Sequence, residues 1–377
     1  MGLFTLPPEL KNSASDRDAQ LFKFDNPSVD VYRLKRCLMA EWEHQGGVQL
    51  TWPHAETDWA YMLEEVIACY VRLAFEIAIR EPLLIVAPNV DEVRTLLEQQ
   101  LPERATQHIR YFQCPTNDTW ARDHGFLCVR DGVKMELMDF RFNGWGGKFA
   151  AEKDNAINAQ LFKEGVLQGH YVDNLDFELE GGSVESDGAG TILTTAVCLL
   201  NKNRNGGPAK GDVEAELAKR LGAEQVLWLH HGELAGDDTD GHIDTLARLC
   251  PNNQIAYVQC SDKEDEHYAS LSAMEAELRQ FRTLTGEPYT LVPLPLPLPI
   301  FDEEGERLPA TYANFLIMNK AVLLPIYNQP QQDAQAHEAL AKIFPQHEIV
   351  DIDCSALVRQ HGSLHCATMQ FPKGVLK

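Results

Sequence analysis

The sequence is poor in basic residues and rich in acidic ones. Among its 377 residues, 33 Lys and Arg stand against 56 Asp and Glu, which gives a formal net charge of −23. Such a charge repels phosphate backbones and anionic lipid surfaces, so we expect no nucleic-acid partner and no membrane partner. A small cationic molecule is favoured instead. Acidic surfaces also serve solubility alone, so the charge does not by itself select a function.

The sequence also lacks the patterns of disulfide bonding, export and membrane insertion. Its nine cysteines include no CxxC pair and are odd in number, which indicates reduced thiols rather than a disulfide framework. Residues 1–16 have neither the basic flank nor the apolar stretch of a signal peptide. The most hydrophobic long segment, 59–80, carries five charged residues, too many for a bilayer span. We therefore expect a cytoplasmic protein.

Helical and strand-like patterns alternate along the chain, which is typical of α/β or α+β proteins. Helices are predicted near 60–80, 91–101, 213–221, 270–284 and 334–343, with Gly222 and Gly286 ending the third and fourth. Short strands are predicted at 83–87, 126–129, 135–140, 191–195, 226–229, 255–259, 315–318 and 321–325. No low-complexity linker divides these elements, so a single domain is the simpler interpretation.

Polar landmarks beside glycines recur at the ends of these strands. They are WARD at 120–123, EGGS at 180–183, GHID at 241–244 and HC at 365–366. The separations from Asp123 to Glu180, from Glu180 to His242 and from His242 to Cys366 are 57, 62 and 124 residues, and 124 is twice 62. The segment 308–327 has the layout of the missing unit. About five units of roughly 60 residues would each send one strand end to a common centre.

The landmarks supply one thiol, one imidazole and several carboxylates, namely Cys366, His242, Asp123, Glu180 and Asp244. One interpretation is a metal site, formed by His242 with Asp244 or by His365 with Cys366, although zinc sites usually show close pairs such as CxxC or HExxH. Another is an amide hydrolase of the Cys-His-Asp type. That mechanism needs only one orienting acid, so it leaves Glu180 and Asp123 without a role.

A surplus of carboxylates around a thiol suits a planar cation. The guanidinium group matches two carboxylates bidentately. Its carbon is a poor electrophile because its charge is delocalised, so the attacking group must be a strong, soft nucleophile such as a thiolate. An imidazole could protonate the departing nitrogen and then activate water to cleave the adduct. His242 suits both roles, with Cys366 as the nucleophile.

Seven ordered motifs resemble those of the agmatine deiminases, and the resemblance covers about 38–372. They are NDTWARD-x-G (117–125), FRFNGWGGK (140–148), LEGGSVESDGAGTILTT (179–195), CLLNKNRN (198–205), GDDTDGHID (236–244), GERLPATYANF (305–315) and GSLHCATMQ (362–370). The segment AEWEHQGGVQLTWPHAETDW (40–59) looks like the usual opening of that family.

The resemblance implies an α/β fold of the pentein type, a five-bladed propeller with pseudo-fivefold symmetry. It implies one pentein domain over 38–377, an N-terminal extension over 1–37, and neither a metal nor an organic cofactor. The implied site residues are the nucleophile Cys366, the acid/base His242, the catalytic Glu180, the guanidinium-binding pair Asp123 and Asp244, and the further substrate-binding residues Trp120 and Thr239. The implied reaction hydrolyses agmatine to N-carbamoylputrescine and ammonia through a thiouronium adduct.

Two departures from the family pattern leave the substrate open. His124 stands where Thr is common, and RQHGSL at 359–364 replaces a glycine-rich segment before the HC pair. Peptidylarginine or free arginine is therefore the alternative substrate. An amidinotransferase and a non-catalytic polyamine-binding protein are more distant alternatives. The oligomeric state is also open, with a homodimer as one expectation.

Overall fold

The computed structural model describes residues 35–377, and its strands form five separate sheets. Of the predicted N-terminal extension, 1–37, residues 1–34 lie outside the described residues. Two sheets have four strands: β1 (Cys37–Leu38), β5 (Leu127–Asp131), β6 (Lys134–Arg141) and β7 (His170–Glu178) in the first, and β17 (Thr368–Pro372), β2 (Gln45–Thr51), β3 (Leu83–Ala87) and β4 (Ile109–Gln113) in the second.

The other three sheets have three strands each. One holds β8 (Val184–Ser186), β9 (Thr191–Thr195) and β10 (Gln225–Leu229). The next holds β11 (Ala247–Cys250), β12 (Gln254–Gln259) and β13 (Thr290–Pro295). The last holds β14 (Leu316–Ile317), β15 (Ala321–Ile326) and β16 (Glu348–Asp353), and its first two strands fall in the predicted fourth unit, 308–327.

The five sheets share one order of strand pairing. In each, an antiparallel pair is followed by a parallel neighbour, as in β8 with β9 and β9 with β10. The same order joins β5–β6–β7, β11–β12–β13, β14–β15–β16 and β17–β2–β3. Because parallel strands need a long crossover, a helix lies in each connection. These helices are α6 (Ile157–Lys163), α8 (Lys210–Leu221), α9 (Tyr268–Leu278), α10 (Pro330–Ile343) and α1 (Leu63–Ala78).

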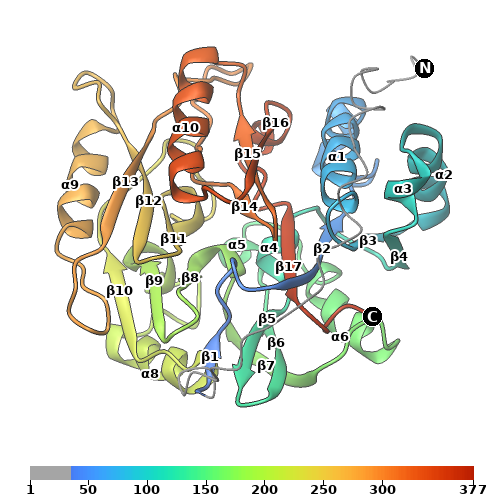
Figure 1. Ribbon diagram of the computed structural model, residues 1–377, viewed down its shortest axis with the longest axis horizontal. Coiled ribbons are helices and arrows are strands. Elements are labelled where there is room, and N and C mark those ends of the chain that lie inside the picture. Colours follow the sequence, from blue (N-terminus) through green and yellow to red (C-terminus); the bar gives the residue numbers. More distant parts are fainter. Residues whose placement is uncertain (1–34) are drawn as a thin grey trace.

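The long helices lie outside the sheets, and short helical turns lie near the centre (Figure 1). Among the outer elements are α2 (Val90–Gln100) and α3 (Glu103–Thr106) beside β3 and β4. The short helices are α4 (Ala121–His124), α5 (Gly144–Gly147) and α7 (Ala196–Leu199). The short 3₁₀ turns are η4 (Asp58–Met62), η5 (Asp154–Ala156), η6 (Gly181–Ser183), η7 (Ile243–Thr245) and η8 (Leu357–Gln360).

The core forms where apolar strands meet the inner faces of these helices. All five residues of β3, with sequence LLIVA, are buried, as expected for a strand with parallel neighbours on both sides. On α1, Val66, Tyr70, Leu73 and Ile77 are fully buried. Their spacing of three and four residues places them on one face of the helix. None of the described helices is both long and apolar enough to span a bilayer.

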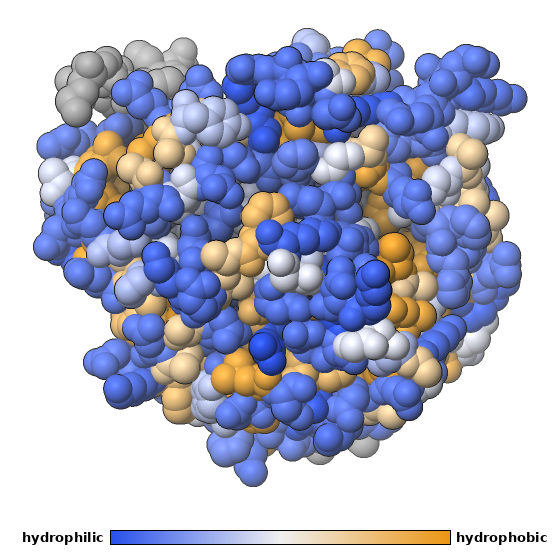
Figure 2. All heavy atoms as spheres, turned by 180° about the vertical axis from the view of Figure 1, so that it is seen from behind, coloured by the Kyte–Doolittle hydropathy of each residue, from blue (hydrophilic) through white to orange (hydrophobic). Residues whose placement is uncertain are grey.

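One sheet joins segments from opposite ends of the described chain. β17 pairs antiparallel with β2, and Thr368 lies opposite Leu50. This pairing completes the sheet that also contains β3 and β4. On the rear face of the molecule, hydrophilic residues predominate and apolar residues form small patches between them (Figure 2).

Candidate active site

The predicted site residues lie just before the first strand of four of the five repeated units. Asp123 is in α4 ahead of β5, and Glu180 precedes η6 and β8. His242 and Asp244 precede β11, while Cys366 precedes β17. In these four units the chemical groups lie in the turn that leads into the first strand. This arrangement brings together residues that are far apart in the sequence.

The bare backbone of Gly182 marks the point where three of these side chains converge. A Cβ atom at Gly182 would lie 2.6 Å from Nδ1 of His242 and 2.8 Å from Oδ1 of Asp123. It would also lie 3.2 Å from Oδ2 of Asp244. The amide of Gly182 donates a hydrogen bond of 3.0 Å to Oδ1 of Asp123. Only glycine allows this approach of backbone to side chains.

Cys366 joins the cluster from the turn before β17. Its Sγ atom lies 3.9 Å from Oδ2 of Asp244, and its amide donates to Oδ1 of Asn314 at 3.2 Å. The residue is 5% exposed. Burial raises the pKa of the thiol well above its ordinary value, and the charges of Asp244 and Asp123 add to this effect. The thiol is therefore protonated until a cation offsets these carboxylates.

His242 is a buried imidazole whose surroundings favour its charged form. Nδ1 lies 3.5 Å from Oδ1 of Asp123, and neither ring nitrogen has a hydrogen-bond partner among the described residues. Burial lowers the pKa of His242, but the charge of Asp123 and the nearby thiol of Cys198 outweigh burial and hold it well above its ordinary value. His242 therefore carries a proton and has ring nitrogens free to act on a ligand.

Glu180 is held by a buried arginine. Nε of Arg204 lies 2.8 and 2.9 Å from the two carboxylate oxygens of Glu180, and both side chains are almost completely buried. Arg204 also donates to Oδ2 of Asp240 at 2.7 Å and to the carbonyl of Thr239 at 2.9 Å. Glu180, Cys198 and His242 could bind a metal by distance, since one ligand atom of each lies within 4.8 Å of the others. The guanidinium of Arg204 already neutralises Glu180, which disfavours a cation there.

A pocket leads from the surface to the thiol. Its lining includes four predicted site residues, Cys366, Asp123, Trp120 and Thr239. The other lining residues are Asp58, Asp118, Trp145, Phe149, Asp238, Gln360, His361 and Gly362. The remaining predicted residues, His242, Asp244 and Glu180, are buried and do not line it. Among the residues that line the pocket, Asp58, Asp118, Asp123 and Asp238 are acidic, and none is Lys or Arg.

Trp120 and Thr239 have defined places in this pocket. The ring centroid of Trp120 lies 5.7 Å from that of Trp59. A Cβ atom on Gly362 would lie 2.3 Å from the Trp120 ring, so Gly362 packs directly on the indole. Oγ1 of Thr239 donates to Asp237 at 2.6 Å and accepts from the amide of His242 at 3.1 Å. Thr239 therefore orders the turn that presents His242.

Three residues that sequence reasoning did not single out support the cluster. Besides Arg204, these are Asn314 and Trp145. Asn314 lies before β14, in the unit that lacks a reactive residue, and contacts both Cys366 and the carbonyl of Asp244. Trp145 donates from Nε1 to Oδ2 of Asp123 at 2.9 Å. Its backbone has a φ of 54°, a strained conformation for a bulky residue. The only sequence signal for a role of Trp145 was its position in the 140–148 motif.

The two departures from the family pattern have different places. Gln360, His361 and Gly362, from the replaced segment, line the pocket. His124 does not line it. Its Nε2 lies 3.2 Å from Oγ1 of Thr51, and burial lowers its pKa to about 3, so it is a neutral core residue. Of the two departures, therefore, only the segment 359–364 reaches the pocket.

Comparison with known proteins identifies close relatives. The sequence model described as Porphyromonas-type peptidyl-arginine deiminase matches residues 37–372. An agmatine deiminase of Pseudomonas putida is 32% identical over 361 residues, which cover 89% of this chain and 95% of that protein. The structure of a Porphyromonas gingivalis protein, provisionally named an arginine deiminase, is 50% identical with a TM-score of 0.85, covering 91% of this chain and 100% of that one.

A third relative has its substrate in place. The structure is that of a C. jejuni agmatine deiminase in which one cysteine is replaced by serine, with substrate bound. It is 38% identical to this chain and has a TM-score of 0.83. The similarity covers 90% of this chain and 97% of the C. jejuni chain.

Proposed function

The chain belongs to the Porphyromonas-type peptidyl-arginine deiminase family, and from this premise we propose that it hydrolyses agmatine to N-carbamoylputrescine and ammonia. The observation that carries the proposal is the buried thiol of Cys366 beside two carboxylates and a protonated imidazole. Relatives named agmatine deiminase resemble this chain over most of their length, which supports the same reaction.

The guanidinium group is proposed to bind between Asp123 and Asp244. Oδ1 of Asp244 is a buried oxygen without a hydrogen-bond partner in the described part of the chain, so it is free to accept from a ligand. Asp123 is fixed by the amide of Gly182 and the indole of Trp145. A planar cation between two fixed carboxylates gains charge-assisted hydrogen bonds and a defined orientation over Sγ. It also offsets the charges that keep the thiol protonated.

Catalysis then proceeds in two steps. The thiol proton leaves to solvent, and the Cys366 thiolate forms a C–S bond to the guanidinium carbon. His242 donates its proton to the departing nitrogen, the C–N bond breaks, and ammonia leaves a thiouronium cation. Neutral His242 next takes a proton from water as the oxygen attacks the same carbon. The C–S bond breaks, the thiolate is restored, and the remaining hydroxyl proton leaves as the carbonyl of the urea product forms.

The charge of the pocket favours agmatine over free arginine. Asp58, Asp118 and Asp238 line the approach to Cys366, and no Lys or Arg lies among the lining residues. A carboxylate on the substrate would find no Lys or Arg among the lining residues and would be repelled by these acids, whereas the primary ammonium of agmatine would be attracted to them. A blocked arginyl peptide, neutral at its backbone, is the second candidate. The family description favours it.

We also propose that residues 38–377 form one pentein domain, a propeller of five blades. The five sheets and their shared order of pairing support this arrangement. The catalytic turns would then surround the pseudo-fivefold axis. That placement would account for the meeting of groups from four units in one buried cluster beside the pocket.

The deciding experiment measures ammonia released from agmatine, free arginine and a blocked arginyl peptide by the purified protein. We expect the highest kcat/KM with agmatine and no turnover by Cys366→Ala. Cys260→Ala is a matched control, since this cysteine is also buried but does not line the pocket. Turnover of the peptide alone would transfer the assignment to the peptidylarginine branch. Ammonia release by Cys366→Ala at the wild-type rate would overturn the mechanism.

A further inference from the structure

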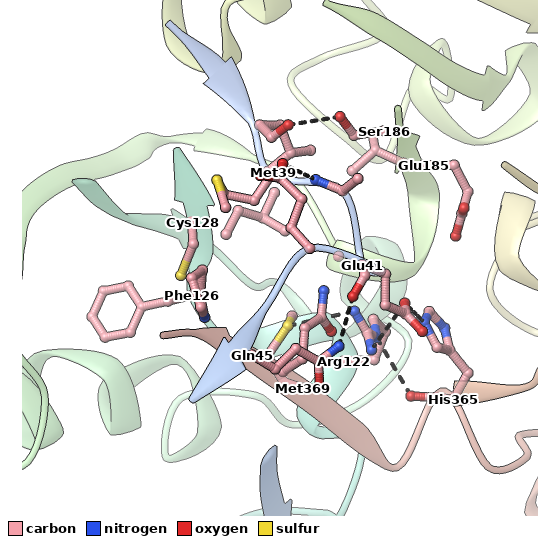
Figure 3. Close-up of a pocket in the computed structure, with 18 residues that line it drawn as sticks. Met39, Glu41, Gln45, Arg122, Phe126, Cys128, Glu185, Ser186, His365 and Met369 are labelled. Carbon is pink, nitrogen blue, oxygen red and sulfur yellow. Dashed lines mark hydrogen bonds and ion pairs between the residues drawn. The ribbon is translucent and has the colours of Figure 1, made fainter. Parts of the chain in front are cut away.

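His365, the residue before Cys366, lies at a second cavity behind the catalytic pocket. Its imidazole faces the carboxylate of Glu41, with Arg122 beside them (Figure 3). Glu185 also lines this cavity. Cys366 lines the catalytic pocket instead, so the dipeptide 365–366 separates the two spaces. The proposed mechanism uses Cys366 and leaves His365 without a role.

Both ring nitrogens of His365 contact carboxylates. Nδ1 lies 2.7 Å from Oδ2 of Asp244, and Nε2 lies 2.6 Å from Oε2 of Glu41. A nitrogen and a carboxylate oxygen approach this closely only with a proton between them. The imidazole of His365 therefore bridges Glu41 and Asp244 through two short hydrogen bonds.

The far side of this bridge is anchored by a buried arginine. Nη2 of Arg248 lies 2.8 Å from the same Oε2 of Glu41, and 3.0 Å from Nε2 of His365. Arg248 and His365 thus contact the same carboxylate oxygen. Oε1 of Glu41 accepts from the amide of Ile317 at 2.6 Å. Glu41 is therefore fixed from both sides and can in turn fix His365.

Acidic and basic side chains alternate in this network. The acidic ones are Asp244, Glu41 and Glu185, and the basic ones are His365, Arg248 and Arg122. By distance, Glu41, Glu185 and His365 could hold a metal, since one atom of each lies within 4.8 Å of the others. Arg248 already bonds both glutamates, so a metal cation there would face a fixed positive charge.

The bridge leaves Asp244 with one occupied oxygen and one free oxygen. Oδ2 is bonded to His365 and lies 3.9 Å from Sγ of Cys366, while Oδ1 has no partner within residues 35–377. We propose that His365 is a positioning residue that holds Asp244 through Oδ2, so that Oδ1 faces the guanidinium and the carboxylate cannot rotate. The inference rests on the proposed function, since it assigns Asp244 to that substrate.

Two neutral substitutions separate the two halves of the bridge. In His365→Asn the side-chain NH₂ can occupy the place of Nδ1 and donate to Asp244. In His365→Gln it reaches the place of Nε2 and donates to Glu41. We expect kcat/KM for agmatine to fall about tenfold in His365→Asn and about a hundredfold in His365→Gln, because displacement of a binding group by about 1 Å has an effect of this size. His337→Asn removes an exposed His–Asp pair and is the control with wild-type kinetics.

The order of the two variants decides the inference. A purely structural bridge would depend on the anchor at Glu41, so equal losses, or a smaller loss in His365→Gln, would overturn it. If His365→Gln does not fold, Glu41→Gln tests the contact between His365 and residue 41 instead. This variant keeps an oxygen for the amide of Ile317. A fall in kcat/KM of about tenfold supports the inference, and wild-type kinetics overturns it.

A binding measurement separates this inference from the proposed reaction. Calorimetric titration with agmatine is carried out on Cys366→Ala and on the same variant combined with His365→Asn or His365→Gln. Weaker agmatine binding by the His365→Gln combination than by the His365→Asn combination supports the positioning role. This holds even if the wild-type protein releases no ammonia, because the absence of ammonia release would defeat only the proposed reaction. Equal affinities in all three proteins, beside an active wild-type enzyme, would defeat only the positioning role.

Discussion

At the scale of single residues, Asp244 has two opposed effects on Cys366. Its carboxylate is proposed to bind the cation that must be attacked, yet its charge raises the pKa of the attacking thiol. A substrate cation resolves the conflict by neutralising Asp244 as it binds. The thiol is therefore least reactive when the pocket is empty, which protects it from unrelated electrophiles.

Asp244→Asn tests these opposed effects. Removing the charge weakens guanidinium binding, so we expect kcat/KM for agmatine to fall by about a hundredfold or more, the effect of losing one charged contact. The pKa of Cys366 should fall, because Asp244 raises it. Alkylation of Cys366 by iodoacetamide, followed by peptide mass spectrometry, should be faster in the variant than in the wild type. Slower alkylation in a folded variant would contradict this account.

Glu81 provides a test of stability against pH. Burial raises the pKa of Glu81 from 4.5 to about 7, although one oxygen accepts from the amide of Asn319. Since the folded pKa exceeds the unfolded one, this group stabilises the fold below about pH 4.5. That stabilisation is lost as pH rises towards 7. We expect Glu81→Gln to gain about 2 to 3 kcal/mol of unfolding free energy relative to wild type between pH 5 and pH 8.

Urea unfolding at the two pH values measures the difference. Glu304→Gln is the control, since Glu304 is an exposed acid in a loop and should show no pH-dependent change relative to wild type. A constant difference between Glu81→Gln and wild type across this range would show that Glu81 is not perturbed.

Sequence reasoning identified the chemical groups but not their supports. Cys366, His242, Asp123, Asp244 and Glu180 were selected by type and spacing, and the structure brings all five together. Their catalytic roles stay predictions. Arg204, Trp145 and Asn314 were not selected, because an arginine, a tryptophan and an asparagine have many structural uses. Only three-dimensional contacts reveal that they hold the carboxylates and the nucleophile.

At the scale of elements, η6 places its backbone inside the catalytic cluster. Gly182 in this turn has no unusual backbone angle to require glycine, so its absence of a side chain is what matters. The space that a Cβ would take is occupied by His242, Asp123 and Asp244. We expect Gly182→Ala to displace these groups and to lower kcat/KM by about a hundredfold or more.

Gly211→Ala is the matched control for Gly182→Ala. Gly211 lies in α8 with ordinary backbone angles, and a Cβ there would meet nothing within 4 Å. Ala is the better helix former, so the melting temperature should stay equal or rise, with activity unchanged. Wild-type ammonia release by Gly182→Ala would show that the crowding around this turn is tolerated.

Regular elements were predicted best where a local pattern determined them. β3 and β9 have the predicted bounds, 83–87 and 191–195, because both are short buried runs of apolar and β-branched residues. Helix α8 ends at Gly222 in the left-handed conformation, as expected. Helix α9 ends at Leu278, well before Gly286, so that prediction was wrong. Nine of the described strands were not predicted. Among them are β2, β7, β16 and β17, whose sequences mix polar and apolar residues and whose pairing is long-range.

At the scale of the whole molecule, the net charge of −23 should influence substrate capture. A strongly anionic protein attracts a cationic substrate, and added salt screens this attraction. We expect kcat/KM for agmatine to fall by roughly threefold or more between low salt and 0.5 M KCl. The value of kcat at saturation should change little, because it describes steps after binding. A kcat/KM that is constant or rises with salt would contradict the expectation.

The repeat was visible in the sequence only through its polar turns. Those landmarks predicted about five units and a common centre, and the sheets have the corresponding order. The contribution of β17 to the sheet of β2 could not be read from spacing, because it joins residues from opposite ends of the described chain.

That joining has a consequence for the timing of activity. Cys366 stands just before β17, so the proposed nucleophile reaches its place only when β17 has paired with β2. During synthesis, Asp123, Glu180, His242 and Asp244 all emerge before it. A chain without 365–377 would lack both the thiol of Cys366 and the contact of His365 with Asp244. Activity is therefore expected only when β17 is in place beside β2.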